Sequence, residues 1–235
     1  MQPVGIIGAM DSEVALLLEK LENAAEVTVG ATVYHTGVLS NVPVVIARCG
    51  IGKVCAAMCA QAMIDRFAVR CIINTGVAGG LKPGLSVGDM VLCTDAVQHD
   101  FDVTAFGYVR GYMCTGEDNQ KPTRYAADAR LRALVASAAA ELADCRTVEG
   151  VIASGDVFVA DAALKQQLLA DFDATAAEME GAAVAQTAVA NGVPFLVIRA
   201  ISDLADGSAS VSFDTFEAKA AAVSAQLLVT ALPLF

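Results

Sequence analysis

The chain has 235 residues and a formal net charge of −11, from 26 acidic and 15 basic residues. Hydrophobic residues make up 56% and charged residues only 17%, so we expect one large α/β domain over residues 1–235 with most elements buried on more than one face. No basic patch is present and no apolar run approaches the roughly 20 residues that span a bilayer, so neither nucleic acid nor a membrane is an expected partner.

The histidines and cysteines give no sign of a metal site. His35 and His99 lie far apart, and the seven cysteines are scattered without a CxxC pair. We therefore expect no metal and no cofactor, and we predict that the cysteines are small buried hydrophobes in a reducing compartment. The N-terminus lacks the cationic region of a signal peptide, which favours a cytoplasmic location.

Hydrophobic periodicity predicts strands and helices that alternate along the chain. In chain order, we expect a strand at 4–9, a helix at 14–21, strands at 28–39 and 42–48, a helix from 50–53 to about 68, strands at 71–74 and 87–96, an irregular stretch at 99–118, a helix at 126–143, a strand at 147–154, a helix at 162–170, a strand at 174–179, a helix at 181–190, a strand at 193–201 and a helix at 213–232. The first helix has Asp11 and Ser12 as candidate caps, and the strand at 71–74 is expected to break at Thr75–Gly80.

Polar residues and glycines gather where the predicted strands end. The five clusters are residues 10–13, 75–80, 154–158, 178–180 and 199–203. Strands that are apolar on both faces and alternate with helices indicate a mainly parallel or mixed sheet between helices. Ligands of such sheets bind beyond the carboxyl ends of strands, so we expect the clusters to converge on one pocket.

Carboxylates in apolar surroundings are the strongest chemical signal. Glu178 and Glu180 stand in an apolar run, where an unpaired charge would cost several kcal/mol. Arg199 also lies in an apolar run and needs an anionic partner, for which Glu13, Glu178 and Glu180 are candidates. Capping of a helix or turn is the plainer interpretation for Glu13 and for Asp203. Together, however, these groups indicate an acid–base site.

Two glycine clusters invite comparison with phosphate-binding loops. Residues 50–53 lack the Walker spacing, and residues 76–80 lack the GxGxxG order. Tight turns or a close approach of the backbone to a flat ligand explain them equally well. With a single buried arginine and no lysine cluster, a phosphate would be poorly held.

Seven motifs, in order over nearly the whole chain, carry a family resemblance. They are Gly5-Ile6-Ile7-Gly8-Ala9-Met10 with Glu13, Gly50-Ile51-Gly52-Lys53, residues 74–80 (NTGVAGG), residues 99–108 (HDFDVTAFGY), Ser154-Gly155-Asp156-Val157-Phe158, Glu178-Met179-Glu180 and Arg199-Ala200-Ile201-Ser202-Asp203. This set resembles the 5′-methylthioadenosine/S-adenosylhomocysteine nucleosidases of the purine nucleoside phosphorylase superfamily.

The resemblance implies a single α/β domain with a mixed twisted sheet flanked by helices. It also implies hydrolysis of the N-glycosidic bond of 5′-methylthioadenosine and S-adenosylhomocysteine, and of 5′-deoxyadenosine as well. Adenine and the thioribose would be released, in methionine salvage and in recycling of S-adenosylmethionine by-products. The relative preference among these substrates stays open.

The family's catalytic roles transfer to matching positions. Glu13 would polarise the attacking water and Arg199 would help to orient it. Asp203 would be the general acid that lets adenine leave as a neutral base. Glu180 would accept hydrogen bonds from the ribose hydroxyls and Met179 would pack against the sugar, whereas the role of Glu178 stays open.

The remaining expected contacts come from the same resemblance. The adenine subsite would comprise Phe158, Val159, Ala78, Gly79 and Ser202. The alkylthio end would be lined by Ile51 and Phe213, and by Val103 and Phe106 from the partner subunit of a homodimer.

One departure and three alternatives accompany this hypothesis. Several family members have Ser at the position of Val77, whose side chain cannot hold the nucleophilic water. Loss of a neutral hydrogen bond costs roughly 0.5–1.5 kcal/mol, so we expect activity to survive. The alternatives are a phosphate-dependent nucleoside phosphorylase, a futalosine-type nucleosidase and a non-catalytic purine-binding protein of the same fold. Glu13, a carboxylate that would repel phosphate, opposes the first, and the presence of Glu13, Glu180 and Asp203 opposes the last.

Overall fold

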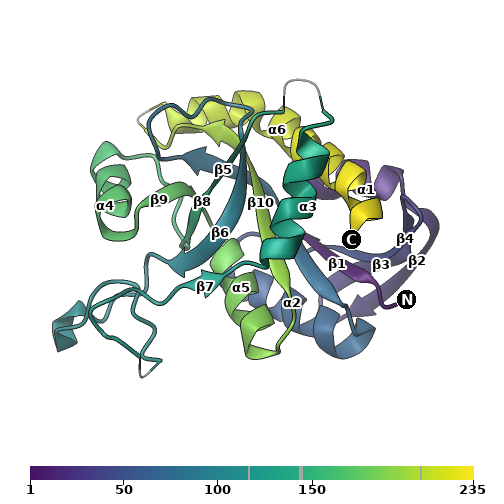
Figure 1. Cartoon of the computed structure of the whole chain (residues 1–235), viewed down its shortest axis with the longest axis horizontal. Helices are drawn as coiled ribbons and strands as arrows, with labels where there is room; N and C mark the ends of the chain where they lie inside the picture. The colour runs from purple at the N-terminus through teal and green to yellow at the C-terminus, as the bar shows by residue number, and fades with distance from the viewer. Residues whose placement is uncertain (116, 143–144, 207) are drawn as a thin grey trace.

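The computed structural model describes residues 1–115, 117–142, 145–206 and 208–235. Within these ranges, ten strands form one mixed sheet between helices, which confirms the expected fold class (Figure 1). The strands are β1 (Val4–Gly8), β2 (Glu22–Val29), β3 (Thr32–Leu39), β4 (Val42–Arg48), β5 (Cys71–Gly80), β6 (Met90–Gln98), β7 (Tyr125–Ala126), β8 (Thr147–Ser154), β9 (Ala174–Glu178) and β10 (Phe195–Asp203). The helices are α1 (Asp11–Glu19), α2 (Lys53–Phe67), α3 (Ala129–Ala139), α4 (Ala162–Phe172), α5 (Gly181–Ala190) and α6 (Ala209–Ala231), with 3₁₀ turns η1 (Thr104–Phe106) and η2 (Leu232–Leu234).

Five strands of the sheet close on themselves. The strand order is β10-β6-β8-β9-β5-β1-β4-β3-β2, and β10 also pairs with β5. Strands β5, β10, β6, β8 and β9 therefore form a closed ring, from which β1, β4, β3 and β2 continue as an open extension. The parallel pairs β1–β4, β1–β5 and β5–β10 bring the carboxyl ends of these four strands to the same side of the sheet, whereas β9 runs antiparallel to β5 and meets its last residues.

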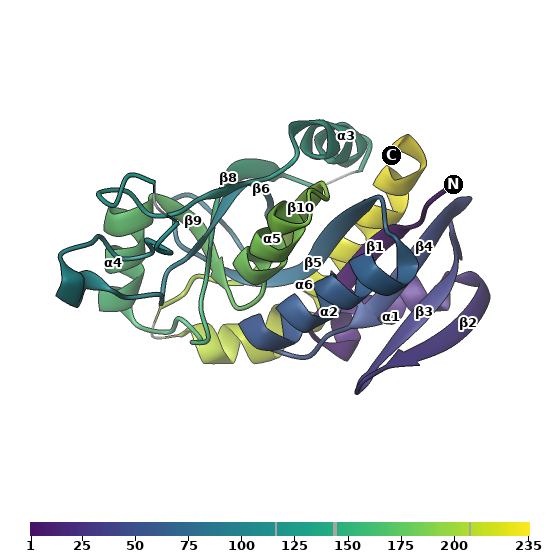
Figure 2. The same ribbon diagram turned by 90° about the horizontal axis from the view of Figure 1, so that it is seen from below.

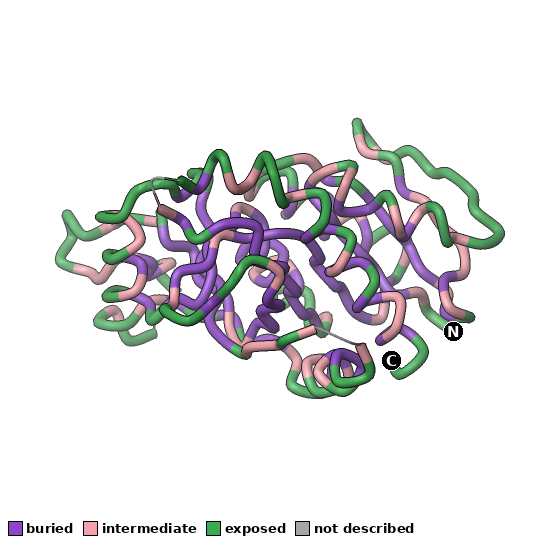
Figure 3. Tube along the Cα trace, turned by 90° about the horizontal axis from the view of Figure 1, so that it is seen from above, coloured by how far each residue is buried: buried purple, intermediate pink, exposed green. Residues whose placement is uncertain are grey.

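Helices cover both faces of the sheet. Helix α6 packs along β5 and β10 and contacts α1 and α3, whereas α2 and α5 pack against each other on the opposite face (Figures 1 and 2). Helix α4 contacts β8 and β9. The central strands are thereby buried on both faces, as the trace in Figure 3 shows, and all nine residues of β10 are buried. This double burial explains why the sequence shows apolar runs instead of alternation.

The predicted break of the strand at Thr75–Gly80 is wrong. β5 continues to Gly80 because it has partners on both sides: Arg199 of β10 lies opposite Gly76, and Ala176 of β9 lies opposite Gly80. The glycines are explained by side chains that approach the strand closely. A Cβ at Gly76 would collide with the Glu13 carboxylate, and one at Gly79 would lie 2.9 Å from Asp203 Oδ1.

Other boundaries also differ from the prediction. The single strand expected at 28–39 is the hairpin β2–β3, which turns at Gly30 with φ +62°. β2 was missed because it is an edge strand whose residues are almost all exposed, so it has no apolar pattern. The helix expected from 126 begins at Ala129, where Asp128 caps it, and its expected end at 143 lies outside the described residues.

Helix α1 and helix α6 begin differently from expectation. Neither Asp11 nor Ser12 caps α1; the N-cap is Met10, and the Glu13 carboxylate accepts the Met10 N–H instead. α6 begins at Ala209, four residues before the predicted start.

The cysteine prediction holds for four of the seven. Cys49, Cys59, Cys71 and Cys93 are buried, but Cys55 and Cys114 are exposed and Cys145 is half-buried. Cys55 is exposed because it lies on the outer face of α2, in line with the exposed Val54 and Met58. All seven are free thiols. None of the described helices is both long enough and apolar enough to cross a bilayer.

Candidate active site

A cavity of about 430 Å³ lies beyond the carboxyl ends of β1, β5, β9 and β10. Its volume lies in the range of small-molecule sites, which is about 300–1,000 Å³. Ten of the expected site residues line it: Glu13, Ile51, Ala78, Gly79, Phe158, Met179, Glu180, Ser202, Asp203 and Phe213. The cavity therefore brings together the polar clusters that the sequence placed at strand ends.

Glu13 is held by backbone N–H groups from two strand ends. Its Oε2 accepts hydrogen bonds from Ala9 N at 2.6 Å and Met10 N at 3.0 Å, and its Oε1 accepts one from Val77 N at 3.0 Å. Burial raises the pKa of this carboxyl, and the positive charge of Arg199 and the three N–H donors oppose that rise only in part. A fixed carboxylate with a raised pKa is suited to accept a proton near neutral pH.

Asp203 lies at the end of β10 and is 1% exposed. Its Oδ1 accepts a hydrogen bond from Ala205 N at 2.8 Å, and its Oδ2 accepts one from the Ser202 hydroxyl at 2.9 Å. Burial raises its pKa despite these two donors. The group is thus biased toward the protonated form that a general acid requires.

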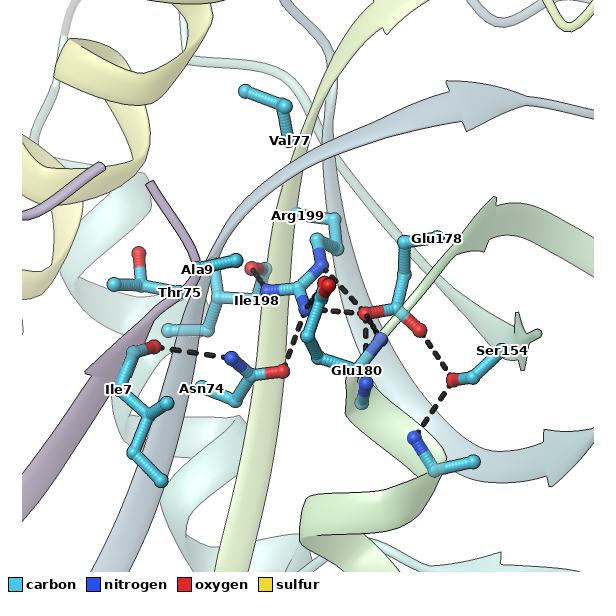
Figure 4. Close-up of polar contacts among 12 residues, drawn as sticks. Ile7, Ala9, Asn74, Thr75, Val77, Ser154, Glu178, Glu180, Ile198 and Arg199 are labelled. Carbon is cyan, nitrogen blue, oxygen red and sulfur yellow. Dashed lines mark hydrogen bonds and ion pairs between the residues drawn. The ribbon is translucent and has the colours of Figure 1, made fainter. Parts of the chain in front are cut away.

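Glu178 is the direct partner of Arg199. Both Nε and Nη2 of the guanidinium donate to Glu178 Oε2, and Nη2 also donates to Asn74 Oδ1 at 2.6 Å (Figure 4). Glu178 Oε2 further accepts the N–H groups of Glu180 and Gly181, and its Oε1 accepts the Ser154 hydroxyl. Of the three partners considered for Arg199, the structure therefore selects Glu178, which is saturated with donors.

Glu180 lies near the same guanidinium but is bound less tightly. Its Oε2 is 3.8 Å from Arg199 Nη2, and its Oε1 accepts the Gly52 N–H at 2.8 Å. Burial and the neighbouring charge of Glu178 raise the pKa of Glu180 to about 7. With Glu178 satisfying the cation, Glu180 keeps hydrogen-bonding capacity for a ligand in the cavity, which it lines.

Aromatic rings form one wall of the cavity. Phe158 and Phe213 pack edge to face, with ring centroids 5.6 Å apart and an interplanar angle of 81°. Both rings are partly exposed, so a flat ligand can reach them. Val159 lines a small adjoining cavity of about 30 Å³ that it shares with Phe158 and Asp203.

Besides Val159, three expected residues do not line the main cavity, and the reason is their position. Arg199 lies beneath it, with its charge directed to Glu178. Val103 and Phe106 belong to the segment between β6 and β7, which projects from the body of the molecule at the lower left of Figure 1. Phe106 at the end of η1 is 78% exposed and does not contribute to its own chain's cavity.

The charges around the cavity are all of one sign. Five carboxyl groups line it, and none of the described lining residues is Lys, Arg or His; the carboxyl groups are Glu13, Glu178, Glu180, Asp203 and Asp214. No group of three or more His, Cys, Asp or Glu side chains in the described ranges could hold a metal ion. The cavity thus suits a neutral or cationic organic ligand better than an anion.

Several supporting residues were missed by the sequence reasoning. Asn74 accepts from Arg199 and donates through Nδ2 to Ile7 O at 3.0 Å, and Ser154 bridges Glu178 to Ala182 N. A buried amide inside an apolar strand was the available signal for Asn74. Ser210 and Asp214 also line the cavity, and nothing in their sequence context marked them, whereas Met10 belonged to the strand-end cluster 10–13 without an assigned role.

Comparison with known proteins shows the family to which the chain belongs. The model of the phosphorylase superfamily matches residues 3–233. A 5′-methylthioadenosine/S-adenosylhomocysteine nucleosidase of Anoxybacillus flavithermus is 46% identical over 226 residues, covering 96% of this chain and 95% of that protein. The chain belongs to the 5′-methylthioadenosine/S-adenosylhomocysteine nucleosidase family.

Solved structures of nucleosidases have the same fold over the whole chain. The Neisseria meningitidis 5′-methylthioadenosine/S-adenosylhomocysteine nucleosidase, in complex with methylthio-immucillin-A, is 41% identical and has a TM-score of 0.93, with 100% of each chain covered. Futalosine hydrolase of Helicobacter pylori is 37% identical with a TM-score of 0.93, covering 100% of this chain and 98% of that one. Membership of the nucleosidase family thus confirms the resemblance that the seven motifs carry.

Proposed function

We propose that the protein hydrolyses the N-glycosidic bond of 5′-methylthioadenosine and S-adenosylhomocysteine, releasing adenine and the thioribose. The observation that carries this proposal is a cavity whose charged lining groups are all carboxyls, with Glu13 and Asp203 lying against different residues of β5. Glu13 contacts Val77 and Asp203 lies against Gly79, while Gly76 directly faces the Glu13 carboxylate. Gly76 and Gly79 are about 10 Å apart at the rise of a β-strand.

In this mechanism Glu13 and Asp203 act at opposite sides of the scissile bond. Glu13 takes a proton from water as the water oxygen bonds to the sugar's anomeric carbon and the bond to the purine nitrogen breaks. Asp203 delivers its proton to the imidazole-ring nitrogen of the purine, so that adenine leaves neutral. The raised pKa of each carboxyl matches the proton that it must accept or donate.

Glu180 holds the sugar, and Arg199 assists the orientation of the water from beneath the cavity, through Glu13. Glu180 accepts hydrogen bonds from the ribose hydroxyls, with Met179 against the sugar ring, and the partial charge of an oxocarbenium-like transition state is stabilised by the surrounding carboxylates. Arg199 assists through its charge, which lowers the proton affinity of Glu13. Phe158 stacks on adenine. Val77 contributes its backbone N–H to Glu13, so the missing hydroxyl of Val77 leaves Glu13 in place.

The first test is the release of adenine in the presence and absence of inorganic phosphate. We expect equal rates and free thioribose as product, because a phosphate ion would meet five carboxyl groups and no lining cation. A requirement for phosphate, or formation of a ribose 1-phosphate, would contradict hydrolysis. Tight adenine-nucleoside binding without any adenine release would instead support the non-catalytic alternative.

A futalosine-type activity remains the second candidate. The structure of the Helicobacter pylori futalosine hydrolase matches this chain as well as the nucleosidase structures do, with a TM-score of 0.93. Side-by-side measurement of kcat/KM on futalosine, 5′-methylthioadenosine, S-adenosylhomocysteine and 5′-deoxyadenosine decides between them and ranks the substrates. We expect the thio-adenosines to be cleaved with the highest kcat/KM.

We further propose that two copies of the chain form a homodimer in which Phe106, with Val103 beside it, completes the partner's cavity. Support comes from exposed apolar side chains near the cavity: Ile51 at its rim, and Val54 and Met58 on the adjacent turns of α2. Exposed apolar groups of this kind mark interaction surfaces. The free thiols support a reducing, cytoplasmic location.

The dimer is tested by Phe106→Ala. Sedimentation equilibrium of the unaltered protein should give twice the chain mass of 24.1 kDa. The variant should stay folded and raise KM for 5′-methylthioadenosine about tenfold, because an apolar wall of the partner cavity is lost. A monomeric protein with full activity would contradict this arrangement, as would a variant with unchanged KM.

A further inference from the structure

A ring of three charged residues lies behind Glu180, outside the cavity lining. Lys53 N donates to Asp156 Oδ1 at 2.8 Å, Asp156 N donates to Asp100 Oδ2 at 2.9 Å, and Asp100 Oδ1 accepts the Lys53 ammonium at 2.5 Å. Each member therefore contacts both of the others. The three residues come from the start of α2, from the end of β6 and from the turn after β8, so the ring joins three segments that are far apart in sequence.

The ring fixes the start of α2, which has no cap of its own. Gly52 is the N-cap and lacks a side chain, so the first helical N–H, that of Lys53, is satisfied by Asp156 from another loop. The preceding N–H, that of Gly52, donates to Glu180 Oε1. The Asp156 carboxylate thus holds the helix start from outside through Lys53, and the N–H of the preceding residue, Gly52, holds Glu180.

The local packing leaves this turn little freedom. Gly52 has φ +102°, and a Cβ there would lie 3.0 Å from Asp156 Oδ1. A side chain at Gly155 would collide with the imidazole of His99, which is 3% exposed beneath the turn. The backbone of this turn thus packs against His99 at Gly155, whereas Asp156 is exposed and directs its Oδ1 to the Gly52–Lys53 backbone.

The charges of the ring favour its persistence. Burial acts to raise the pKa of Asp100, but the Lys53 ammonium and the Asp156 N–H outweigh it and hold that pKa below its ordinary value. The Lys53 ammonium also donates to Gln98 Oε1 at 3.0 Å, and Gln98 donates to Gln186 on α5. Because the Lys53 side chain is only 17% exposed, solvent screens the Lys53–Asp100 pair less than an ordinary surface pair.

We propose that Lys53, Asp100 and Asp156 are positioning residues that set the Gly52 N–H against Glu180 and so align Glu180 for the ribose hydroxyls. This inference rests on the proposed function for the role of Glu180, and it adds three residues that touch no substrate. A misplacement of about 1 Å in such a contact can lower the rate by a hundredfold, so the ring should matter although it lies outside the cavity.

The test compares Asp156→Ala, Asp156→Asn and Asp161→Ala. Asparagine still offers an oxygen to the Lys53 N–H, so Asp156→Asn should retain most activity. Asp161 provides the matched control because it caps α4 from the same loop region, through Ala163 N and Leu164 N, but has no contact with Glu180. Each variant is assayed on 5′-methylthioadenosine and on its 2′,3′-dideoxy analogue, which offers no hydroxyl to Glu180.

We expect Asp156→Ala to lower kcat/KM for 5′-methylthioadenosine by about 10- to 100-fold, the effect of losing an aligned hydrogen bond to a charged group. The loss should shrink to less than threefold on the dideoxy analogue, and Asp161→Ala should show less than threefold loss on either. Equal losses of Asp156→Ala on both substrates, no loss at all, or failure of Asp156→Asn to restore activity would overturn the proposal. If the unaltered enzyme releases no adenine, the proposed function fails instead.

Discussion

At the scale of single residues, three buried acids, Glu13, Glu178 and Glu180, share the buried cation of Arg199, and their contacts separate their roles. Glu178 binds Arg199 and has every oxygen occupied by donors, which answers the question that the sequence left open about it. Glu180, only two residues further on, is held by Gly52 and carries a raised pKa. The need of Arg199 for an anion could be predicted from its apolar surroundings. That Glu178 is the anion could not be predicted, because β9 and β10 are not paired in the sheet and the sequence gives no sign that these two residues meet.

Replacement of the general acid should separate chemistry from binding. Asp203→Asn keeps the shape and the hydrogen bond from Ala205 N but has no acidic proton, so kcat should fall by about 10²- to 10⁴-fold while the KM for 5′-methylthioadenosine changes little. Steady-state release of adenine measures both quantities.

Asp206→Asn is the matched control for that experiment. Asp206 lies three residues later, does not line the cavity and bonds to Ser208 instead. It should leave kcat within twofold of the unaltered enzyme. Near-normal turnover of Asp203→Asn would show that another group protonates the purine.

At the scale of elements, β5 sets the spacing of the site. It approaches Glu13 through Gly76 and Val77 and Asp203 through Gly79, and it pairs with β10 from Ile72 to Gly79. The apolar core of this strand was predictable from Cys71–Asn74, whereas its continuation through the glycines was not. Glycine normally weakens a strand, and here the cost is offset by pairing on both sides and by the carboxylates that the missing side chains admit.

A single methyl group on β5 should therefore disable the base. A Cβ at Gly76 would collide with Glu13 Oε1, so Gly76→Ala should displace that carboxylate and lower kcat/KM by at least about a hundredfold. The free energy of unfolding should fall by only about 1–3 kcal/mol, as for other overpacked sites. Urea unfolding and adenine release together test this.

Gly80→Ala is the comparison variant on the same strand. Its new methyl would lie 3.2 Å from Ile201 Cγ2 and would touch no carboxylate. We expect a similar loss of stability with kcat/KM within about threefold of the unaltered enzyme. If both variants lost activity to the same extent, the effect of Gly76→Ala would be one of packing and not of the base.

At the scale of the whole molecule, this acidic chain buries several carboxyl groups whose charged form is disfavoured by burial. Glu13, Glu180 and Asp203 all have pKa values raised first of all by burial. A raised pKa means that the folded state binds the proton more tightly than the unfolded chain. The stabilising contribution is therefore complete below the ordinary pKa and is lost as pH rises through the folded-state value. The ligand-free protein should lose stability toward alkaline pH.

The variant Glu180→Gln should lose less of its free energy of unfolding than the unaltered protein as the pH rises. For Glu180 the pH window runs from the ordinary value of 4.5 to about 7. The variant has no proton to release, so its stability relative to the unaltered protein should increase by about 1–3 kcal/mol between pH 5 and pH 8. Urea unfolding at the two pH values provides the measurement, with the exposed Glu141→Gln as control. A difference that does not change with pH would contradict a proton held by Glu180.

The closed ring of β5, β10, β6, β8 and β9 has a consequence for aggregation. A strand inside a ring offers no long free row of N–H and C=O groups to a foreign chain, so among the described residues in this half of the molecule only the two-residue β7, paired with β6 outside the ring, presents an edge. The long open edge is β2, at the far end of the sheet order, and its exposed Glu22 and Glu26 disfavour pairing with a second acidic copy. Amyloid-like growth, which needs a free edge, is thereby kept away from the catalytic half.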